Sequence, residues 1–232
     1  MVLAAVTVPP VRPGGTILAS YPRSGNTLLR MLLGAALSGR TDWDVKGGRE
    51  VAVDLHKVEP RDPALEDLAD PRVFKTHMGP SPDVQRFILL VRHPADVFVS
   101  YHAVRAAMGR QESLMDLIEP FLSGGVWPCD WGGFAARWLA AAENRPALIL
   151  RYEDIVQGPR QALEQVAAFL DVDIPPARLQ AAVSMAEPAV YAQISRSRVA
   201  SRSREGARRL PPDLSARFPA RWPRLCGRFG YR

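Results

Sequence analysis

The most constraining feature of this sequence is a short apolar run followed by a tight turn and a helix. Residues 16–20, TILAS, have the length and composition typical of a buried strand. Residues 21–25, YPRSG, form a turn, and residues 26–37 have the apolar spacing of a helix. Free backbone N–H groups at the start of such a helix attract anions. The segment therefore predicts a strand–loop–helix unit that resembles the phosphate-binding loop of nucleotide-binding proteins.

Residues 72–76, 87–91 and 147–151 are three further strand candidates. We expect helices over residues 94–108, 113–122, 132–143, 159–170, 176–186 and 213–226. We expect loops or short helices over residues 38–71, a loop over 124–133 and an irregular basic stretch over 187–212. Strands that alternate with helices indicate an α/β fold, with a central parallel sheet flanked by helices. The expected organisation is an N-terminal arm, residues 1–15, and a single domain, residues 16–232.

The positive charge of the chain is concentrated near its C-terminus. The 232 residues carry a formal net charge of +6, and residues 196–232 alone hold 11 Arg and two acidic residues, a net charge of +9. Such a segment attracts anions: nucleic acid, an acidic membrane or a phosphorylated small molecule. A nucleic-acid-binding module is one reading, but few aromatic residues lie among these arginines and no nucleic-acid-binding motif is present.

Targeting and redox signals are weak in this sequence. No apolar run reaches the roughly 18 residues of a membrane-spanning helix, and the first residues do not read as a signal peptide. The two cysteines, Cys129 and Cys226, make neither a disulfide framework nor a metal cluster. We therefore expect a cytoplasmic protein with no membrane or nucleic-acid partner and no metal site.

The first turn differs from the loop of nucleoside triphosphatases. The pattern G-x-x-x-x-G-K-[ST] aligns with residues 20–27, where Gly25 and Thr27 match. Asn26 replaces the lysine that grips the phosphates, and Arg23 places a cation inside the loop instead. The loop therefore suits a phosphate-like group, and Asn26 argues against a P-loop kinase. A plain turn between strand and helix is the alternative interpretation.

Two other strand ends carry polar side chains. Lys75 lies near the end of the second strand candidate, residues 72–76, and His77 follows it. Arg92 follows the third, residues 87–91, eight residues before Ser100. Ligands of open α/β sheets bind outside the C-terminal ends of the strands. Histidine is suited to take a proton near neutral pH, and an arginine and a hydroxyl can share a phosphate. The alternatives are a structural histidine, an ion pair between Arg92 and Asp96, and a serine on the helix surface.

These segments, in this order, resemble the motifs of the PAPS-dependent sulfotransferase family; PAPS is 3′-phosphoadenosine-5′-phosphosulfate. YPRSGNT, residues 21–27, is similar to the family's 5′-phosphosulfate loop, YPKSGTTW. FKTH, residues 74–77, matches the segment with the catalytic histidine, and VRHPADVFVSY, residues 91–101, is similar to the 3′-phosphate motif. LRYEDI, residues 150–155, is similar to the YEDL segment, and residues 201–231 resemble the R-K-G loop and closing helix.

The resemblance implies in-line transfer of a sulfuryl group from PAPS to a hydroxyl of a small-molecule acceptor, which leaves PAP (3′-phosphoadenosine-5′-phosphate). His77 would be the general base, and Arg23 and Lys75 would stabilise charge around the sulfuryl group. The residues that would hold the nucleotide are Arg23, Ser24, Gly25, Asn26, Thr27, Leu28, Arg92, Ser100, Tyr152, Ser184, Arg202, Arg204 and Gly206. An intact FKTH segment argues against a catalytically dead scaffold.

The sequence departs from the family pattern at two positions. Leu28 replaces an aromatic residue that often stacks on the adenine, and Glu205 replaces the lysine of the R-K-G loop. Arg202, Arg208 and Arg209 are candidates for the missing cation. Adenine stacking on the Leu28 side is therefore open.

The sequence leaves the acceptor open. A natural product, phenol or alcohol is expected, and a carbohydrate or glycoconjugate is the alternative. The pocket would lie among residues 38–71, 78–86 and 108–133. Its apolar walls could come from Trp43, Met108, Phe121, Trp127 and Trp131, each of which could equally be core. His56 and Glu50 are second candidates for a base or for acceptor contacts. A bacterial enzyme of specialised metabolism is expected from the compact, Arg- and Ala-rich chain, and a homodimer is left open.

Overall fold

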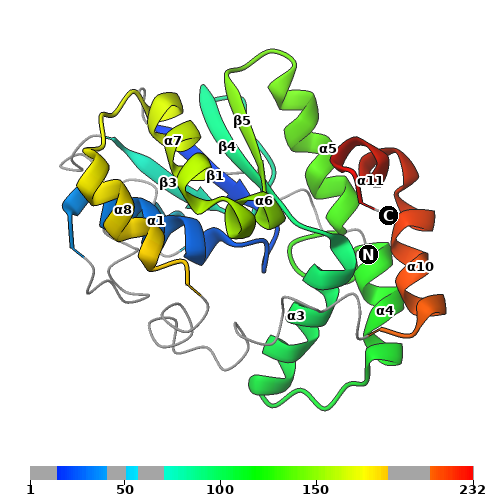
Figure 1. Cartoon of the computed structure of the whole chain (residues 1–232). Helices are drawn as coiled ribbons and strands as arrows, with labels where there is room; N and C mark the ends of the chain where they lie inside the picture. The colour runs from blue at the N-terminus through cyan, green and yellow to red at the C-terminus, as the bar shows by residue number, and fades with distance from the viewer. Residues whose placement is uncertain (1–14, 41–50, 57–70, 188–209, 232) are drawn as a thin grey trace.

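The computed structural model describes residues 15–40, 51–56, 71–187 and 210–231. The strands are β1 (Thr16–Ser20), β2 (Ala52–Asp54), β3 (Val73–Thr76), β4 (Arg86–Val91) and β5 (Ala147–Arg151). The helices are α1 (Asn26–Ser38), α3 (Pro94–Ala107), α4 (Leu114–Ser123), α5 (Trp131–Ala142), α6 (Tyr152–Gln157), α7 (Pro159–Leu170), α8 (Pro176–Ser184), α10 (Pro212–Arg221) and α11 (Pro223–Phe229). The strands form one parallel sheet in the order β2-β3-β1-β4-β5 (Figure 1).

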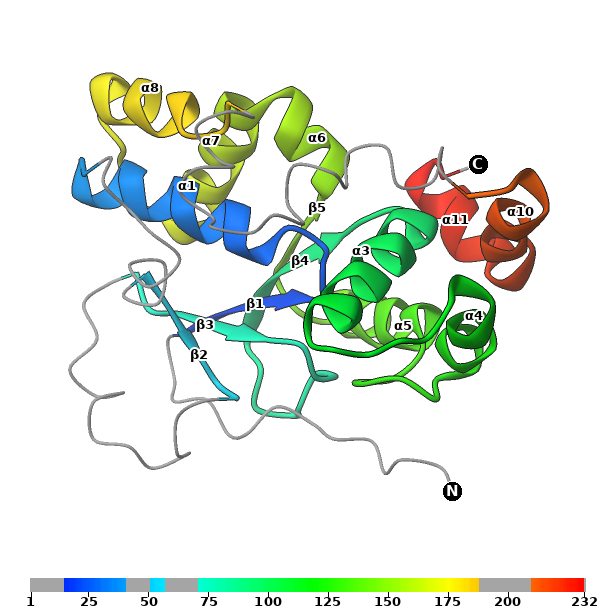
Figure 2. The ribbon, with the colours of Figure 1, turned by 90° about the horizontal axis from the view of Figure 1, so that it is seen from below.

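Helices cover both faces of the sheet because the side chains of each strand alternate between the two faces. Ile17 and Ala19 of β1 are buried against residues of α3, α4, α5, α10 and α11. Leu18, between them, is buried in a second core cluster with residues of α1, α7 and α8. Figure 1 and Figure 2 show these two groups of helices on opposite sides of the sheet. The expected α/β fold with a central parallel sheet is confirmed.

The four predicted strands are confirmed with shifts of one residue at most. β2, however, lies inside residues 38–71, where we expected only loops and short helices. That expectation was wrong because Ala52–Asp54 is a three-residue edge strand without an apolar run, which its pairing with β3 holds in place. The N-terminal arm falls outside the described residues, apart from Gly15.

Most predicted helices are present, with three corrections. Trp131 begins α5 inside the expected loop, with the Asp130 side chain as its N-cap. α6 was not expected; it begins at Tyr152, immediately after β5. The single helix predicted near the C-terminus is divided into α10 and α11, because Pro223 starts a new helix and the preceding residue has a non-helical backbone.

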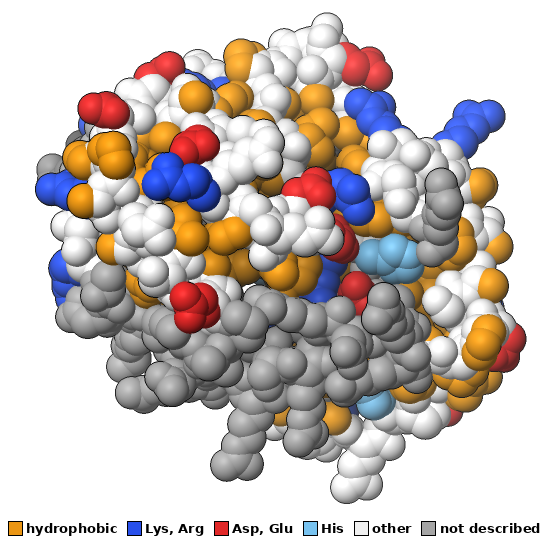
Figure 3. Space-filling model, in the orientation of Figure 1, with side chains coloured by type: hydrophobic (Ala, Val, Ile, Leu, Met, Phe, Trp, Pro, Cys, Tyr) orange, Lys and Arg blue, Asp and Glu red, His pale blue; other side chains and the backbone are white. Residues whose placement is uncertain are grey.

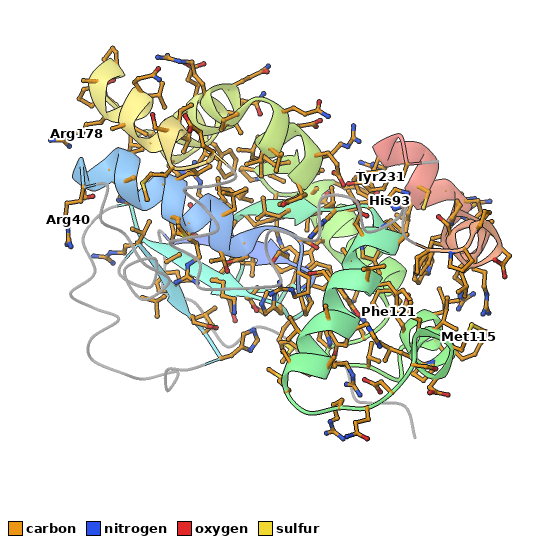
Figure 4. All side chains as sticks on the ribbon, turned by 60° about the horizontal axis from the view of Figure 1, so that its bottom comes forward. Arg40, His93, Met115, Phe121, Arg178 and Tyr231 are labelled. Atoms are coloured by element: carbon orange, nitrogen blue, oxygen red, sulfur yellow. The ribbon has the colours of Figure 1, made fainter. Side chains whose placement is uncertain are left out.

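The C-terminus is attached to the sheet through Tyr231. This side chain is buried, and its hydroxyl donates to Glu153 Oε2 at 3.1 Å. Glu153 Oε1 accepts from the backbone N–H of His93 at 2.9 Å. The rings of His93 and Tyr231 lie 5.2 Å apart, side by side in Figure 4. The end of the chain is thus fixed against the starts of α3 and α6, which follow β4 and β5.

The order of the strands places β1 at the switch point of the sheet. β3 pairs with one edge of β1 and β4 with the other. In such folds the carboxyl ends of the strands beside the switch point form the ligand-binding edge. Within the described ranges, no helix combines the length and apolar character needed to cross a membrane.

Candidate active site

The loop after β1 has an unusual backbone. Arg23 and Gly25 both have positive φ angles, 72° and 97°, and the Ser24 N–H donates to the Tyr21 carbonyl at 3.2 Å. Gly25 is the N-cap of α1, and it provides no side-chain cap to the first turn. The N–H groups at the start of α1 therefore provide a partial positive charge that attracts an anion.

Only glycine fits at position 25. A Cβ atom there would lie 2.5 Å from Cδ2 of Tyr152, the first residue of α6. The Arg92 guanidinium lies over the Tyr152 ring, 4.2 Å from the ring centroid. This cation–π contact and the close approach to Gly25 pack the end of β5 against the loop.

Three predicted phosphate-binding residues meet on one side of the loop. Arg23 Nε donates to Ser100 Oγ at 3.0 Å, and Arg92 Nη1 donates to the Arg23 carbonyl at 3.0 Å. Arg92 and Ser100 are only 3% and 1% exposed, so the interpretation of Ser100 as a serine on the helix surface was wrong. The loop, the end of β4 and α3 together place two guanidinium groups and a hydroxyl at one location.

Two polar atoms in the loop lack hydrogen-bond partners among the described residues. These atoms are Ser24 Oγ and Asn26 Oδ1, and both are buried. The other end of the Asn26 amide donates to Ser20 Oγ at 3.2 Å. An unpaired buried polar atom costs about 1–3 kcal/mol, which a ligand can recover. The Ser24 hydroxyl can donate to an anionic oxygen.

His77 lies on the other side of β1 from Arg92. Its Nδ1 atom is 2.6 Å from the Ser20 carbonyl oxygen, which can only accept, so Nδ1 carries the proton and Nε2 keeps a lone pair. Burial, together with the nearby charge of Lys75, lowers the pKa of His77 to about 3. The imidazole is therefore neutral at neutral pH and can accept a proton at Nε2.

This side of the site is completed by Asp54, His56 and Trp127. The sequence analysis named His56 and Trp127 as candidates, but not Asp54. Lys75 Nζ donates to Asp54 Oδ2 at 2.9 Å. His56 Nε2 accepts from the His77 backbone N–H at 2.9 Å, and the two imidazole rings stack with centroids 5.8 Å apart. Trp127, which is 46% exposed, contacts both rings edge-on at 5.6 Å. A shared two-residue spacing, D-L-H and K-T-H, was the available signal.

The other predicted wall residues divide between core and surface. Phe121 and Trp131 are buried in the core, whereas Met108 is 78% exposed after the end of α3. Leu28 is buried in the core cluster that includes α1 residues. Trp43, Glu50, Arg202, Arg204, Gly206, Arg208 and Arg209 lie outside the described residues, as does Glu205.

Ser184 is the last residue of α8, and its hydroxyl donates to the Gln180 carbonyl at 3.3 Å. It lines a cavity of about 250 Å³ between α6, α7 and α8, together with Val156, Pro159, Gln180, Val183, Ala186 and Glu187. Its role toward the adenine stays a prediction. Thr27 lies in the first turn of α1, directly after Asn26.

The charges around the site are mixed. Figure 3 shows basic, acidic and histidine side chains close together on one face of the molecule. Among residues 15–40, 51–56, 71–187 and 210–231, no three His, Cys, Asp or Glu side chains form a group that could hold a metal ion. The arginine, lysine and backbone N–H groups around the loop make anion binding the chemistry that this arrangement offers most directly.

Known proteins similar to this chain share one type of domain. Residues 13–187 match the family model described as "Sulfotransferase domain". The chain is 28% identical to sulfotransferase 1B1 of Mus musculus over 179 residues, which cover 68% of this chain and 59% of that protein. The chain spans 59% to 62% of the length of the first curated relatives that it matches.

Solved structures with the same fold include two complexes. Mouse sulfotransferase SULT7A1 in complex with PAP superposes with a TM-score of 0.71 at 18% identity, covering 90% of this chain and 82% of that one. Retinol dehydratase in complex with androsterone and the inactive cofactor PAP gives a TM-score of 0.69 at 16% identity, covering 94% and 82%. These superpositions confirm the single-domain α/β fold.

Proposed function

Because the chain belongs to the sulfotransferase family, we propose that it moves the sulfuryl group of PAPS to a hydroxyl of a small-molecule acceptor. The observation that carries this proposal is the distribution of groups around the loop after β1. Arg92 and Ser100 lie on the β4 side of β1, and Lys75 and His77 lie on its β3 side. Transfer from PAPS needs one site for the 3′-phosphate, a second site for the 5′-phosphosulfate and a base for the acceptor hydroxyl, which matches this arrangement.

Buried features of the site fit the nucleotide. The Ser24 hydroxyl, which has no hydrogen-bond partner among the described residues, and the start of α1, which has no side-chain cap there, would hold the 5′-phosphosulfate, together with Asn26 and Thr27. Arg92 and Ser100 would hold the 3′-phosphate, since an arginine fork and a hydroxyl together satisfy phosphate oxygens. Tyr152, packed between Arg92 and Gly25, would contact the adenosine.

The chemistry follows from which groups are charged. When bound, PAPS supplies an electrophilic sulfur whose bond to the bridging oxygen breaks as the acceptor oxygen attacks. Nε2 of His77 would take the acceptor's hydroxyl proton, since Nδ1 already donates to Ser20. Arg23, Lys75 and the loop N–H groups would stabilise the negative charge that develops toward the 5′-phosphate, as fixed donors do in phosphoryl transfer.

The acceptor would bind beside His77 and Trp127. The exposed part of the indole offers a flat apolar wall next to the base, which favours a phenol, a polycyclic alcohol or another planar natural product. Retinol dehydratase has been solved with androsterone, which supports an apolar alcohol here as well. A sugar hydroxyl is the alternative, because carbohydrate rings also stack on indole faces.

The direct experiment incubates the protein with sulfur-labelled PAPS and a panel of phenols, steroid alcohols, fatty alcohols and sugars. We expect label transfer to at least one hydroxyl compound, at least about 100-fold slower in His77→Ala, with PAP binding retained. His102→Asn is the control, because His102 lies on α3 and its ring contacts the Glu112 carbonyl beyond the end of that helix. Binding of Mg-ATP with no binding of PAP would contradict the proposal.

A further inference from the structure

The register between β2 and β3 aligns two pairs of chemically active residues. Asp54 at the end of β2 pairs with Lys75 of β3. Beyond the strand ends, His56 meets His77 with the same sequence separation of 21 residues. The three-residue edge strand therefore places Asp54 beside Lys75, and the turn after it places His56 beside His77.

Asp54 holds the Lys75 ammonium group and the turn that follows β2. Its Oδ2 accepts from Lys75 Nζ at 2.9 Å, and its Oδ1 accepts from the His56 backbone N–H at 3.2 Å. The side chains of Lys75 and Asp54 are only 10% and 11% exposed. A flexible lysine chain in this position is thus restricted to one direction by a partly desolvated ion pair.

His56 holds the backbone and one face of His77. Its Nε2 accepts from the His77 N–H, and its ring lies nearly parallel to the His77 ring, at an interplanar angle of 11°. Ser20 fixes the same imidazole from the β1 side, through Nδ1. The direction of the His77 Nε2 lone pair is therefore set from two sides.

We propose that Asp54 and His56 form a clamp, here called the β2 clamp, that positions Lys75 and His77 for the reaction. The proposal rests on the proposed function and assigns new positioning residues to that site. Neither residue needs to touch the donor: Asp54 acts through the Lys75 ammonium, and His56 acts through the main chain and ring of His77.

The β2 clamp predicts an unusual combination of effects for Asp54. A carboxylate beside an anion site repels the anion, so Asp54→Asn should not weaken PAP binding. The same variant removes the carboxylate charge that orients Lys75, and misplacing a catalytic group by about 1 Å can slow a reaction about 100-fold. A purely structural residue would instead lower stability and PAP affinity together.

The first experiment compares Asp54→Asn with Asp171→Asn. Asp171 makes a more exposed ion pair, 3.2 Å to Arg86 at the amino-terminal end of β4, and serves as a solvent-exposed comparison. We expect kcat of Asp54→Asn to fall about 10- to 100-fold with PAP affinity unchanged or higher, while Asp171→Asn keeps both values. A kcat for Asp54→Asn within about twofold of the wild type, or a parallel loss of PAP affinity and thermal stability, would overturn the role of Asp54.

A second measurement does not depend on activity. Lys75 is one of only three lysines, with Lys46 and Lys57 as internal references. Acetic anhydride labelling, followed by mass spectrometry of the nucleotide-free protein, should modify Lys75 several-fold faster in Asp54→Asn than in the wild type. An unchanged relative rate would show that Asp54 does not hold the ammonium group.

His56 is tested with two substitutions. His56→Phe keeps a ring but removes the acceptor, so the His77 amide should exchange its hydrogen faster and kcat should fall about tenfold. His56→Gln restores an acceptor oxygen and should recover part of both effects. Equal amide exchange in the wild type and in His56→Phe would overturn the role of His56. The labelling and exchange results stand even if no sulfuryl transfer is found, so failure of the clamp and failure of the proposed function are distinguishable.

Discussion

The Nδ1 atom of His77 lies 2.6 Å from the main-chain oxygen of Ser20, the last residue of β1. This hydrogen bond joins the proposed base to the strand that leads into the phosphate loop. It also fixes the proton on Nδ1 and leaves Nε2 as the acceptor. The base and the anion site are therefore held by one strand, which restricts their relative position without a flexible linker.

His77 should make the protein sensitive to acid. Its folded-state pKa is about 3, whereas an imidazole in the unfolded chain titrates near 6.5. Between these values the unfolded chain binds a proton that the folded chain does not, so stability falls as the pH falls below about 6.5, at up to about 1.4 kcal/mol per pH unit. We expect His77→Asn to lose less thermal stability than the wild type between about pH 7 and pH 4.5. A loss of equal size in both would contradict the buried, neutral imidazole.

Arg92→Ala should weaken binding of the 3′-phosphate selectively. The buried guanidinium would make charge-assisted hydrogen bonds to that phosphate, each worth about 1.5–3 kcal/mol. Calorimetric titration should therefore show PAP affinity falling about 10- to 100-fold while 5′-AMP affinity changes little. Arg137→Ala is a control, since that arginine lies on α5 and donates to Cys129 Sγ. Equal losses for both nucleotides would assign Arg92 another role.

Gly25→Ala should damage the loop more than a positive φ angle alone can explain. Gly109 is the matched control, because its φ angle of 86° is similar to the 97° of Gly25 and a Cβ there would meet nothing within 4 Å. Both alanine variants suffer left-handed strain of about 1–2 kcal/mol. Only Gly25→Ala adds the clash with Tyr152, so urea unfolding should show the larger loss of stability, and PAP binding should be lost only there. Similar results for the two variants would mean that Tyr152 moves away at little cost.

Tyr231→Phe should loosen the C-terminus. The hydroxyl donates to a partly buried carboxylate, Glu153, and such hydrogen bonds contribute about 1.5–3 kcal/mol. We expect the free energy of unfolding to fall by about that amount, measured by urea denaturation. Tyr101→Phe serves as a comparison, because its hydroxyl donates to an uncharged carbonyl, that of Trp127. A smaller effect for Tyr231→Phe than for Tyr101→Phe would argue against an anchoring role.

The sequence predicted the centre of the fold well because each central strand contains adjacent apolar residues next to a turn or a helix start. Both faces of the central strands β1, β3 and β4 are buried. Strands of this kind can be recognised from the sequence alone. Their parallel arrangement brings the residues at their carboxyl ends to one edge, so Lys75, His77 and Arg92 could be expected near the loop. The order of the motifs, which resembles that of sulfotransferases, then suggested a role for each of these residues.

The β2 clamp could not be predicted, because it depends on register. Ala52–Asp54 is too short to show a strand pattern, and nothing in the sequence aligns Asp54 with Lys75. The residues of the apolar wall could not be chosen from the sequence either, because the choice depends on which aromatic side chains are buried. Trp131 is in the core, whereas Trp127 is partly exposed beside His77. Packing between elements, and not local composition, determines these positions.

The central claim is that the loop and Arg92 together select a nucleotide with a 3′-phosphate. Isothermal titration of the wild-type chain with PAP, 5′-AMP and Mg-ATP tests it most directly. We predict that PAP binds at least about 100-fold more tightly than 5′-AMP, because only PAP places a phosphate on Arg92 and Ser100. Mg-ATP should bind more weakly than PAP, since Asn26 occupies the position of the phosphate-gripping lysine. Equal affinity for PAP and 5′-AMP, or tighter binding of Mg-ATP, would contradict the account.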